Sequence, residues 1–128
     1  MPDPVHIPAG QPDLQDWQGG AHGDVKVRLL VDASGGPSSE IAQSLAEMGP
    51  GDGEDLHSHD RAQTGYVVEG SGQAVFDGRT LDIGKGDAVF VPKGTPHGWR
   101  AGDDGMTVLC TFAADRADEV ETTFDDAG

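Results

Sequence analysis

The chain has 128 residues, the ordinary size of one domain. It carries 23 acidic side chains against eight basic ones, for a formal net charge of −15, so nucleic acid and anionic membranes are not expected as partners. No apolar run reaches the roughly 20 residues that span a bilayer, and the first residues lack a secretory signal, which favours a cytoplasmic protein. Twenty glycines and eight prolines indicate many turns and hence an all-β fold.

The acidic residues are dispersed along the whole chain. They run from Asp3 to Asp126, and only three lysines accompany them. A uniformly acidic, lysine-poor surface is typical of a halophilic protein from a salt-rich cytoplasm, because dissolved ions screen its self-repulsion. The alternative interpretation, a face that recruits cationic ligands, would need the acids to gather in one place.

Taken in order, the sequence predicts an arm, a barrel and a tail. Residues 1–24 contain four of the prolines and are expected to form an extended arm. The alternating residues 25–29 predict a half-buried strand, followed by a turn at 34–37. Residues 25–114 are assigned to a single antiparallel β-barrel or jelly roll. Residues 115–128 are assigned to an acidic tail that begins with a short helical turn.

One segment of the barrel is ambiguous. Ile41, Leu45 and Met48 have the spacing of a helix, but the segment is short and residues 49–51 close it, so we expect a strand over 40–48. Asp77-Gly78 is a strong signal for a two-residue hairpin. Further short strands are expected at 64–68, 73–76, 79–83, 87–91, 97–100 and 106–112.

Three of the five histidines stand in informative places. His57 and His59 are separated by one residue, so in a strand both imidazoles leave the same face, close enough to share one metal ion. His97 follows a proline- and glycine-rich turn, where a neighbouring strand can begin. Neutral imidazole is a good ligand for Fe, Mn, Ni, Zn or Cu. By themselves, two histidines at this spacing are weak evidence for a metal site.

The residues around these histidines form two spaced motifs. The first contains Gly51, His57, His59, Gln63 and Gly70, and the second contains Gly86, the run 92–94 and His97. Together and in this order they resemble the two signature motifs of the cupin superfamily, which are small β-barrels with a metal near the barrel axis.

The resemblance implies a divalent transition metal held by His57, His59 and His97. The fourth ligand in the first motif is usually glutamate, and this chain has Gln63 in its place. The resemblance also implies a homodimer, in which the N-terminal arm contributes a strand to the partner.

Gln63 changes the expected chemistry of such a centre. A neutral amide oxygen is a weaker donor than a carboxylate and leaves the charge of the ion uncompensated, so the centre should favour an anionic small-molecule ligand. The alternative is that Gln63 only forms a hydrogen bond within the barrel. Glutamine also cannot accept a proton. Tyr66, Asp60 and Glu69 are the remaining candidates for a base, although Asp60 should face away from His59.

Four residues are candidates for the lining of the pocket: Trp99, Tyr66, Phe76 and Met48. Phe76 and Met48 fit an ordinary core better, and Trp99 fits either environment equally well. Cys110 lies in an apolar strand, which predicts a buried, inert thiol.

The resemblance permits two functions without choosing a catalytic residue. The first is a metal-dependent, dioxygenase-like enzyme, or a lyase or decarboxylase, acting on a small enolisable, dicarbonyl or carboxylate compound. The alternative is a cupin that binds a small ligand or a metal without turnover.

Overall fold

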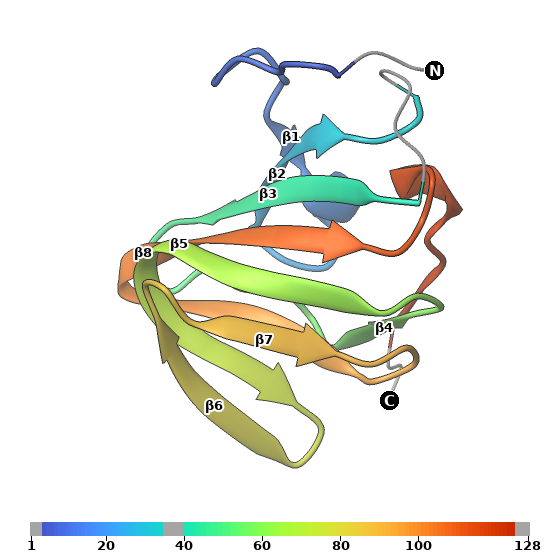
Figure 1. Ribbon diagram of the computed structural model, residues 1–128. Coiled ribbons are helices and arrows are strands. Elements are labelled where there is room, and N and C mark those ends of the chain that lie inside the picture. Colours follow the sequence, from blue (N-terminus) through green and yellow to red (C-terminus); the bar gives the residue numbers. More distant parts are fainter. Residues whose placement is uncertain (1–3, 35–39, 125–128) are drawn as a thin grey trace.

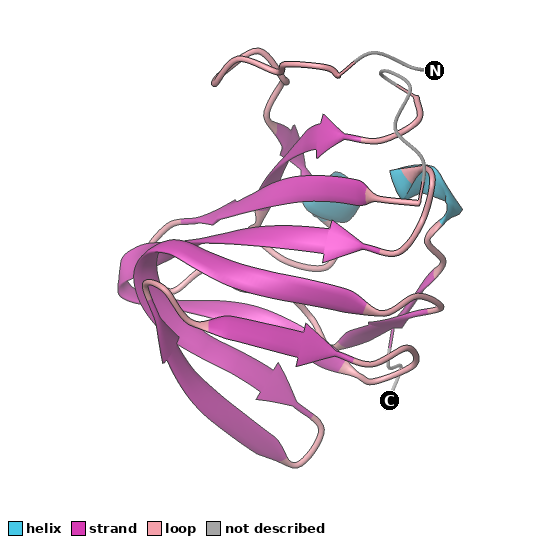
Figure 2. Ribbon diagram, viewed as in Figure 1, coloured by secondary structure: helices cyan, strands magenta, loops and turns pink. Residues whose placement is uncertain are grey.

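The computed structural model describes residues 4–34 and 40–124, and strands make up almost all of its regular structure (Figure 1, Figure 2). The strands are β1 (Gln15–Asp16), β2 (Lys26–Val31), β3 (Ala42–Met48), β4 (His57–His59), β5 (Gln63–Phe76), β6 (Arg79–Gly84), β7 (Ala88–Val91), β8 (His97–Phe112) and β9 (Thr122–Phe124). Two short 3-10 helices are η1 (Trp17–Gly20) and η2 (Ala117–Glu119). None of the helices in the described residues is long and apolar enough to cross a membrane. The predicted all-β fold is confirmed.

All strands pair antiparallel in one curled sheet. The order along one path is β1-β2-β3-β8-β4-β9, while β5 pairs with β6, β7 and β8. Because β8 pairs with β3, β4 and β5, it connects the parts of the sheet on either side of the interior. Figure 1 shows the sheet curling round on itself, which is the predicted antiparallel barrel of jelly-roll type.

β5 and β8 are long strands, and each of them spans a region for which the sequence predicted two shorter strands. β5 continues through Gly70 and Gly72 with a shift of register against β8. At Gly70, φ is +78° and an added Cβ would lie 2.1 Å from the carbonyl oxygen of Gly105. Glycine is required there because no other residue fits that space and that backbone conformation. A bend in the strand, rather than a loop, therefore separates the predicted segments.

Side chains alternate between the interior and the outer face. In β5, the odd-numbered residues from Gln63 to Val67 are buried, whereas the even-numbered residues between them are exposed. The 40–48 segment is a strand from Ala42, as predicted. The buried core consists of Val25, Ala46, Met48, Val67, Ala74, Ile83, Trp99, Ala101, Met106, Val108 and Cys110.

The separate arm predicted for residues 1–24 is wrong for its second half. β1 pairs with β2, and the ring of Trp17 lies 4.7 Å from that of His57. His22, in the same segment, stacks on Phe124 with ring centroids 3.5 Å apart. The turn residues around this two-residue strand hide it from any periodicity argument. The homodimer implied by the family resemblance stays a prediction.

The loose tail predicted for residues 115–128 is wrong as far as residue 124. The predicted helical turn is present as η2, but it leads into β9, which pairs with β4. In that ladder Ser58 lies opposite Thr123, and His59 lies opposite Thr122. Three residues are too few to show a strand pattern in the sequence. The C-terminal strand is therefore part of the histidine site.

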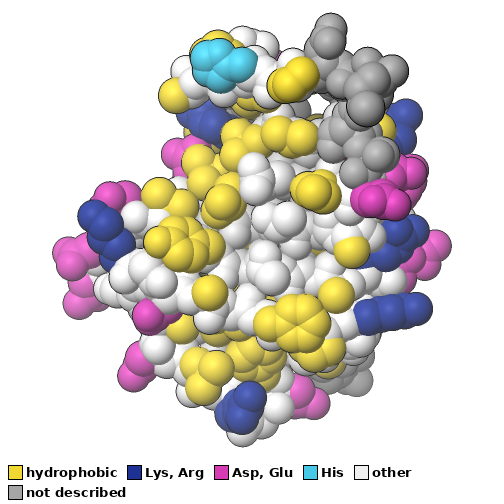
Figure 3. Space-filling model, viewed as in Figure 1, with side chains coloured by type: hydrophobic (Ala, Val, Ile, Leu, Met, Phe, Trp, Pro, Cys, Tyr) yellow, Lys and Arg dark blue, Asp and Glu magenta, His cyan; other side chains and the backbone are white. Residues whose placement is uncertain are grey.

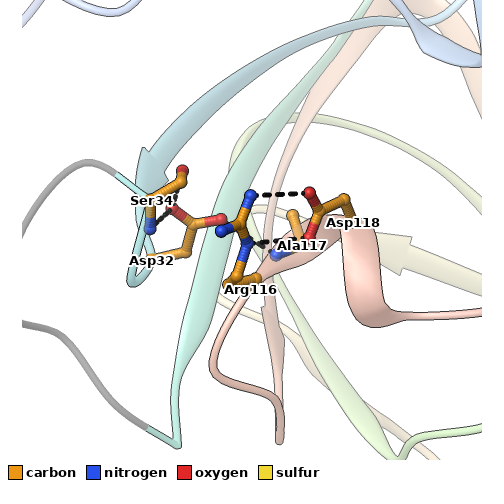
Figure 4. Close-up of polar contacts among 5 residues, drawn as sticks. All are labelled: Asp32, Ser34, Arg116, Ala117 and Asp118. Atoms are coloured by element: carbon orange, nitrogen blue, oxygen red, sulfur yellow. Dashed lines mark hydrogen bonds and ion pairs between the residues drawn. The ribbon is translucent and has the colours of Figure 1, made fainter.

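Asp32 ties the segment before β9 to the end of β2 (Figure 4). Its carboxylate is buried and accepts hydrogen bonds from the backbone N–H of Ala117, at 2.9 Å, and from the N–H of Ser34. Beside it, Arg116 donates two hydrogen bonds to Asp118. A buried carboxylate with several donors holds backbone firmly, so residues far apart in the sequence are fixed together here.

On the face drawn in Figure 3, charged and hydrophobic side chains occupy different regions. In the view of Figure 3, hydrophobic side chains gather over the sheet, and acidic and basic side chains lie around its margins. Tyr66 and Phe90, which point outward from β5 and β7, are 48% and 64% exposed. The turn predicted at 34–37 falls outside the described residues apart from Ser34.

Candidate metal centre

Strand pairing brings the three predicted histidines together. His57 and His59 both point inward from β4, and His57 lies directly opposite His97 of β8. All three side chains are buried, and one ligand nitrogen from each can be chosen so that all lie within 4.8 Å of one another. This cluster satisfies the spacing that a single metal ion needs, and the i, i+2 argument accounts for two of its members.

The Nδ1 atom of each of the three imidazoles has a hydrogen-bond partner. Nδ1 of His57 lies 2.8 Å from the carbonyl oxygen of Asp55, and Nδ1 of His97 lies 2.9 Å from that of Thr95. Because a carbonyl can only accept, both Nδ1 atoms carry the proton, which leaves the lone pair on Nε2. Hydrogen bonds of this kind orient a metal-ligating histidine and increase its basicity.

His59 receives its partner from the C-terminal strand. The hydroxyl oxygen of Thr122 lies 3.0 Å from Nδ1 of His59. A hydroxyl can accept the Nδ1 proton, so the same tautomer is available to all three histidines. The rings of Phe112 and His59 pack in a T-shaped arrangement, with centroids 5.1 Å apart. These contacts fix the direction in which the imidazole points.

The histidines are neutral at physiological pH. Burial lowers the pKa of His57 to about 3 and that of His59 to about 4, because an imidazolium ion loses its hydration in the interior. The neighbouring histidines lower both values further, since like charges repel. Burial also lowers the pKa of His97. Neutral imidazole is the form that binds a metal.

Gln63 lies at the same site. It is the first residue of β5, is 3% exposed and lines the same cavity as His57 and His59. Among the described residues, two buried side-chain atoms have no hydrogen-bond partner, and they are Oε1 of Gln63 and Nε2 of His97. An unsatisfied buried polar atom costs about 1–3 kcal/mol. A metal ion would satisfy both atoms, so these residues fit the group that the family implies.

The cluster opens onto a cavity of about 380 Å³. His57, His59, Gln63 and Trp99 contribute to its wall, whereas His97 packs against the other two histidines without lining it. This volume suits a small molecule rather than a polymer.

Only one of the four pocket residues predicted from the sequence lies at this cavity, and it is Trp99. Tyr66 is on the outer face, because it alternates with the inward-facing residues of β5. Phe76 lines a separate groove beside β6 and β7, and Met48 is part of the core.

None of the three bases proposed from the sequence lines the cavity. Tyr66 points away from it, and the Glu69 side chain is 67% exposed and pairs with Lys85. Asp60 accepts a hydrogen bond from the backbone N–H of Glu121 outside the cavity. Cys110 does line it, but burial raises its thiol pKa, so the thiol stays protonated as predicted.

Sequence reasoning missed four residues at the site. Trp17, Thr122 and Phe124 lie in segments that were predicted to be an arm and a tail, and all three contact a histidine of the cluster. Glu54 stands among other acidic residues in a stretch typical of a solvated loop, yet its side chain lines the cavity. Only the pairing of distant strands reveals them, so no local pattern could have found them.

A small antiparallel barrel with a buried cluster of neutral histidines beside its cavity could hold a metal ion. The sequence matches the model of the cupin domain over residues 44–112, and the chain belongs to the cupin family. The resemblance of the two motifs is thereby confirmed.

Its curated relatives include enzymes that act on small carboxylates. The chain is 29% identical over 125 residues to the dimethylsulfoniopropionate lyase DddW of Ruegeria pomeroyi, covering 97% of this chain and 82% of the relative. It is 33% identical over 101 residues to the oxalate decarboxylase OxdC of Bacillus subtilis, covering 74% of this chain but only 25% of that relative.

Solved structures show the same fold. The polyketide cyclase RemF from Streptomyces resistomycificus aligns with a TM-score of 0.80 at 24% identity, covering all of this chain and 88% of that one. An RmlC-like cupin from Shewanella frigidimarina aligns with a TM-score of 0.71 at 28% identity, covering 93% of this chain and 99% of that one.

Proposed function

We propose that the protein is a metal-dependent cupin enzyme of the lyase or decarboxylase type, acting on a small compound that carries a carboxylate. The observation that carries the proposal is the buried cluster itself, whose free Nε2 of His97 and Oε1 of Gln63 lack any other partner among the described residues. Two of the relatives reported above are named after a small substrate that carries a carboxylate, and this supports the choice of substrate class.

His57, His59 and His97 would hold the ion, with Gln63 as a fourth, neutral ligand. A bound divalent ion supplies a Lewis acid that polarises a carboxylate or carbonyl oxygen. Because all four side chains are neutral, none of them offsets the positive charge of the centre, which favours an anionic substrate. The cavity wall above the cluster orients that substrate and excludes water.

An oxygenase is the less favoured reaction class. The curated relatives named above are a lyase and a decarboxylase, and neither name describes an oxygenase. Oxygen uptake by the metal-loaded protein with diketones and flavonols tests the dioxygenase-like alternative directly.

Metal content is the first test. We expect elemental analysis of the purified protein to show about one transition-metal ion per chain, and His57→Ala to lose it. A His6→Ala variant is the matched control, because His6 lies outside the cluster. Protein that binds no metal after loading with Fe, Mn, Ni, Zn or Cu would overturn the proposal.

Turnover is the second test. Metal-loaded protein is incubated with dimethylsulfoniopropionate or oxalate, and NMR follows the loss of each compound. Consumption of either one supports an enzyme.

Replacement of the usual glutamate by Gln63 favours a second candidate function, a cupin that binds an anion without turnover. Calorimetric binding of oxalate, with no consumption of either compound, would establish that function instead. Gln63→Glu shows whether residue 63 is a ligand, since unchanged metal affinity would mean that it is not.

A further inference from the structure

One carboxyl group in the cavity has no role in holding the histidines. Glu54 precedes β4 and lines the same cavity as His57, His59 and Gln63. Its backbone N–H donates to the carbonyl oxygen of Trp99 at 3.0 Å, and the N–H of Trp99 donates back to Oε1 of Glu54 at 3.0 Å. Glu54 is therefore held on both sides by one residue of β8.

The second carboxyl oxygen of Glu54 is available to a ligand. Oε1 is held by Trp99, while Oε2 has no hydrogen-bond partner among the residues that the structure describes. The titratable side chains that share the cavity wall with Glu54 are His57, His59, Cys110 and Asp118. Asp118 is 67% exposed and pairs with Arg116, so Glu54 is the carboxyl group on the inner part of this wall.

With the histidines assigned to the ion and Asp118 exposed, the described residues offer no other proton acceptor on the inner part of the cavity wall. Gln63 stands where the family usually has a glutamate and cannot take up a proton, and Tyr66, Asp60 and Glu69 do not line the cavity. The Cys110 thiol stays protonated. Glu54 is thus the carboxyl group that can take a proton from a substrate inside this cavity.

We propose that Glu54 is the catalytic base of this cavity and takes a proton from the substrate carbon next to the carboxylate. This inference rests on the function proposed above. The C–H bond breaks and its proton moves to Oε2 of Glu54. The electron pair of that bond forms a carbon–carbon double bond as a leaving group departs from the next carbon with its own bonding pair. The proton then passes from Oε2 to solvent.

The environment of Glu54 supports this role. Burial raises the pKa of its carboxyl group to about 8, while the hydrogen bond from Trp99 opposes the shift. A base whose pKa lies near the working pH combines a useful ionised fraction with a strong pull on the proton. An ordinary exposed glutamate is a much weaker base.

The test compares Glu54→Gln with wild type and with Glu69→Gln. The amide of Glu54→Gln keeps an acceptor for the Trp99 N–H but cannot take a proton, and Glu69 is an exposed control of the same type. We expect Glu54→Gln to reduce consumption of dimethylsulfoniopropionate about 100-fold or more. Its metal content should match that of wild type and its melting temperature should not be lower, because the amide removes a carboxylate whose burial costs stability. Glu69→Gln should behave as wild type in every measurement.

A second measurement needs neither metal nor turnover. NMR of the metal-free protein with carboxyl-¹³C glutamate should show one of the six glutamate signals titrating near pH 8, and Glu54→Gln should lack that signal. A Glu54 signal that titrates with the exposed glutamates would overturn the proposal.

The outcomes of turnover are distinguishable. Unchanged turnover in Glu54→Gln would overturn the role of Glu54 and leave the proposed function intact. Wild-type protein that consumes oxalate but not dimethylsulfoniopropionate would overturn the role of Glu54 alone, because oxalate has no C–H bond to break. Wild-type protein that binds metal but consumes neither compound would overturn both.

Discussion

Gly65 determines how closely Trp99 approaches the strand that faces it. A Cβ at residue 65 would lie 2.6 Å from Cη2 of Trp99 and 3.2 Å from Cγ1 of Val108. Both neighbours are buried, so neither can move without disturbing the core or the cavity wall. The missing side chain is therefore a packing requirement of the site.

We expect Gly65→Ala to destabilise the fold by about 1–3 kcal/mol through overpacking, measured as the midpoint of urea unfolding. Gly84→Ala is the control, because its added Cβ would meet nothing closer than Ser71 Cβ at 3.9 Å. Equal stability of the two variants would contradict this account of Trp99.

The titration of the histidines makes the metal-free fold sensitive to acid. The pKa values of His57 and His59 are about 3 and about 4 in the folded chain and about 6.5 when unfolded. Between pH 6.5 and 4 the unfolded chain binds more protons, so stability falls as the pH falls. Glu54 acts in the opposite direction, since its raised pKa costs stability as the pH rises from about 4.5 to 8.

The histidine effect is therefore measured in a Glu54→Gln background. We expect the unfolding free energy of the metal-free variant to drop by about 2 kcal/mol per histidine between pH 7 and pH 5. Chemical denaturation at the two pH values measures it. A constant free energy would show that the histidines are solvated.

At the scale of elements, β9 connects the end of the described chain to the metal centre. Its residue Thr122 holds Nδ1 of His59, while Thr123 is exposed on the opposite face. We expect Thr122→Val to weaken metal binding about 10-fold or more, because the hydrogen bond between the Thr122 hydroxyl and Nδ1 orients the His59 imidazole toward the ion. Competition with a chelator measures the affinity, and Thr123→Val should have no effect. Equal affinities would mean that β9 serves only to cover the barrel.

The sequence predicted the elements whose pattern is local. The 42–48 strand, the hairpin at Asp77-Gly78 and the inward pair His57 and His59 all follow from alternation or from turn chemistry. The spacing of the two motifs predicted His97 and Gln63 as further residues of the site. These residues share the site because their strands pair, as the family pattern implies.

The rest depends on contacts between distant segments. β1 and β9 are two and three residues long, too short to alternate, and they form because the barrel offers a partner strand. Glu54 stands in a stretch typical of a solvated loop and is partly buried because β8 lies against it. Such positions are determined by contacts between segments that are far apart in the sequence, and no short stretch of the chain reveals those contacts.

At the scale of the molecule, the net charge of −15 should make stability depend on salt. Repulsion among dispersed acidic side chains weakens as dissolved ions screen it. We therefore expect a higher unfolding midpoint in molar KCl than in dilute buffer. Equal midpoints in the two solutions would contradict the interpretation of the acidity as adaptation to salt.

The same charge should govern the binding of anions to the metal-loaded protein. The surface repels an anion at long range, while coordination and hydrogen bonds at the site act at short range and are screened much less. We expect the affinity for oxalate to rise as KCl is added, as measured by calorimetry. For a site surrounded by positive charge, the affinity would fall.

The pairing of β4 with β8 and β9 also sets the order in which a growing chain can acquire its metal. A nascent chain that has exposed His57 and His59 offers two ligands and no strand to hold them. His97 arrives with β8, and the hydroxyl that orients His59 arrives only with β9. The full ligand set exists only after the barrel has closed, so an ion held by this set would enter a nearly finished protein rather than serve as a template for its folding.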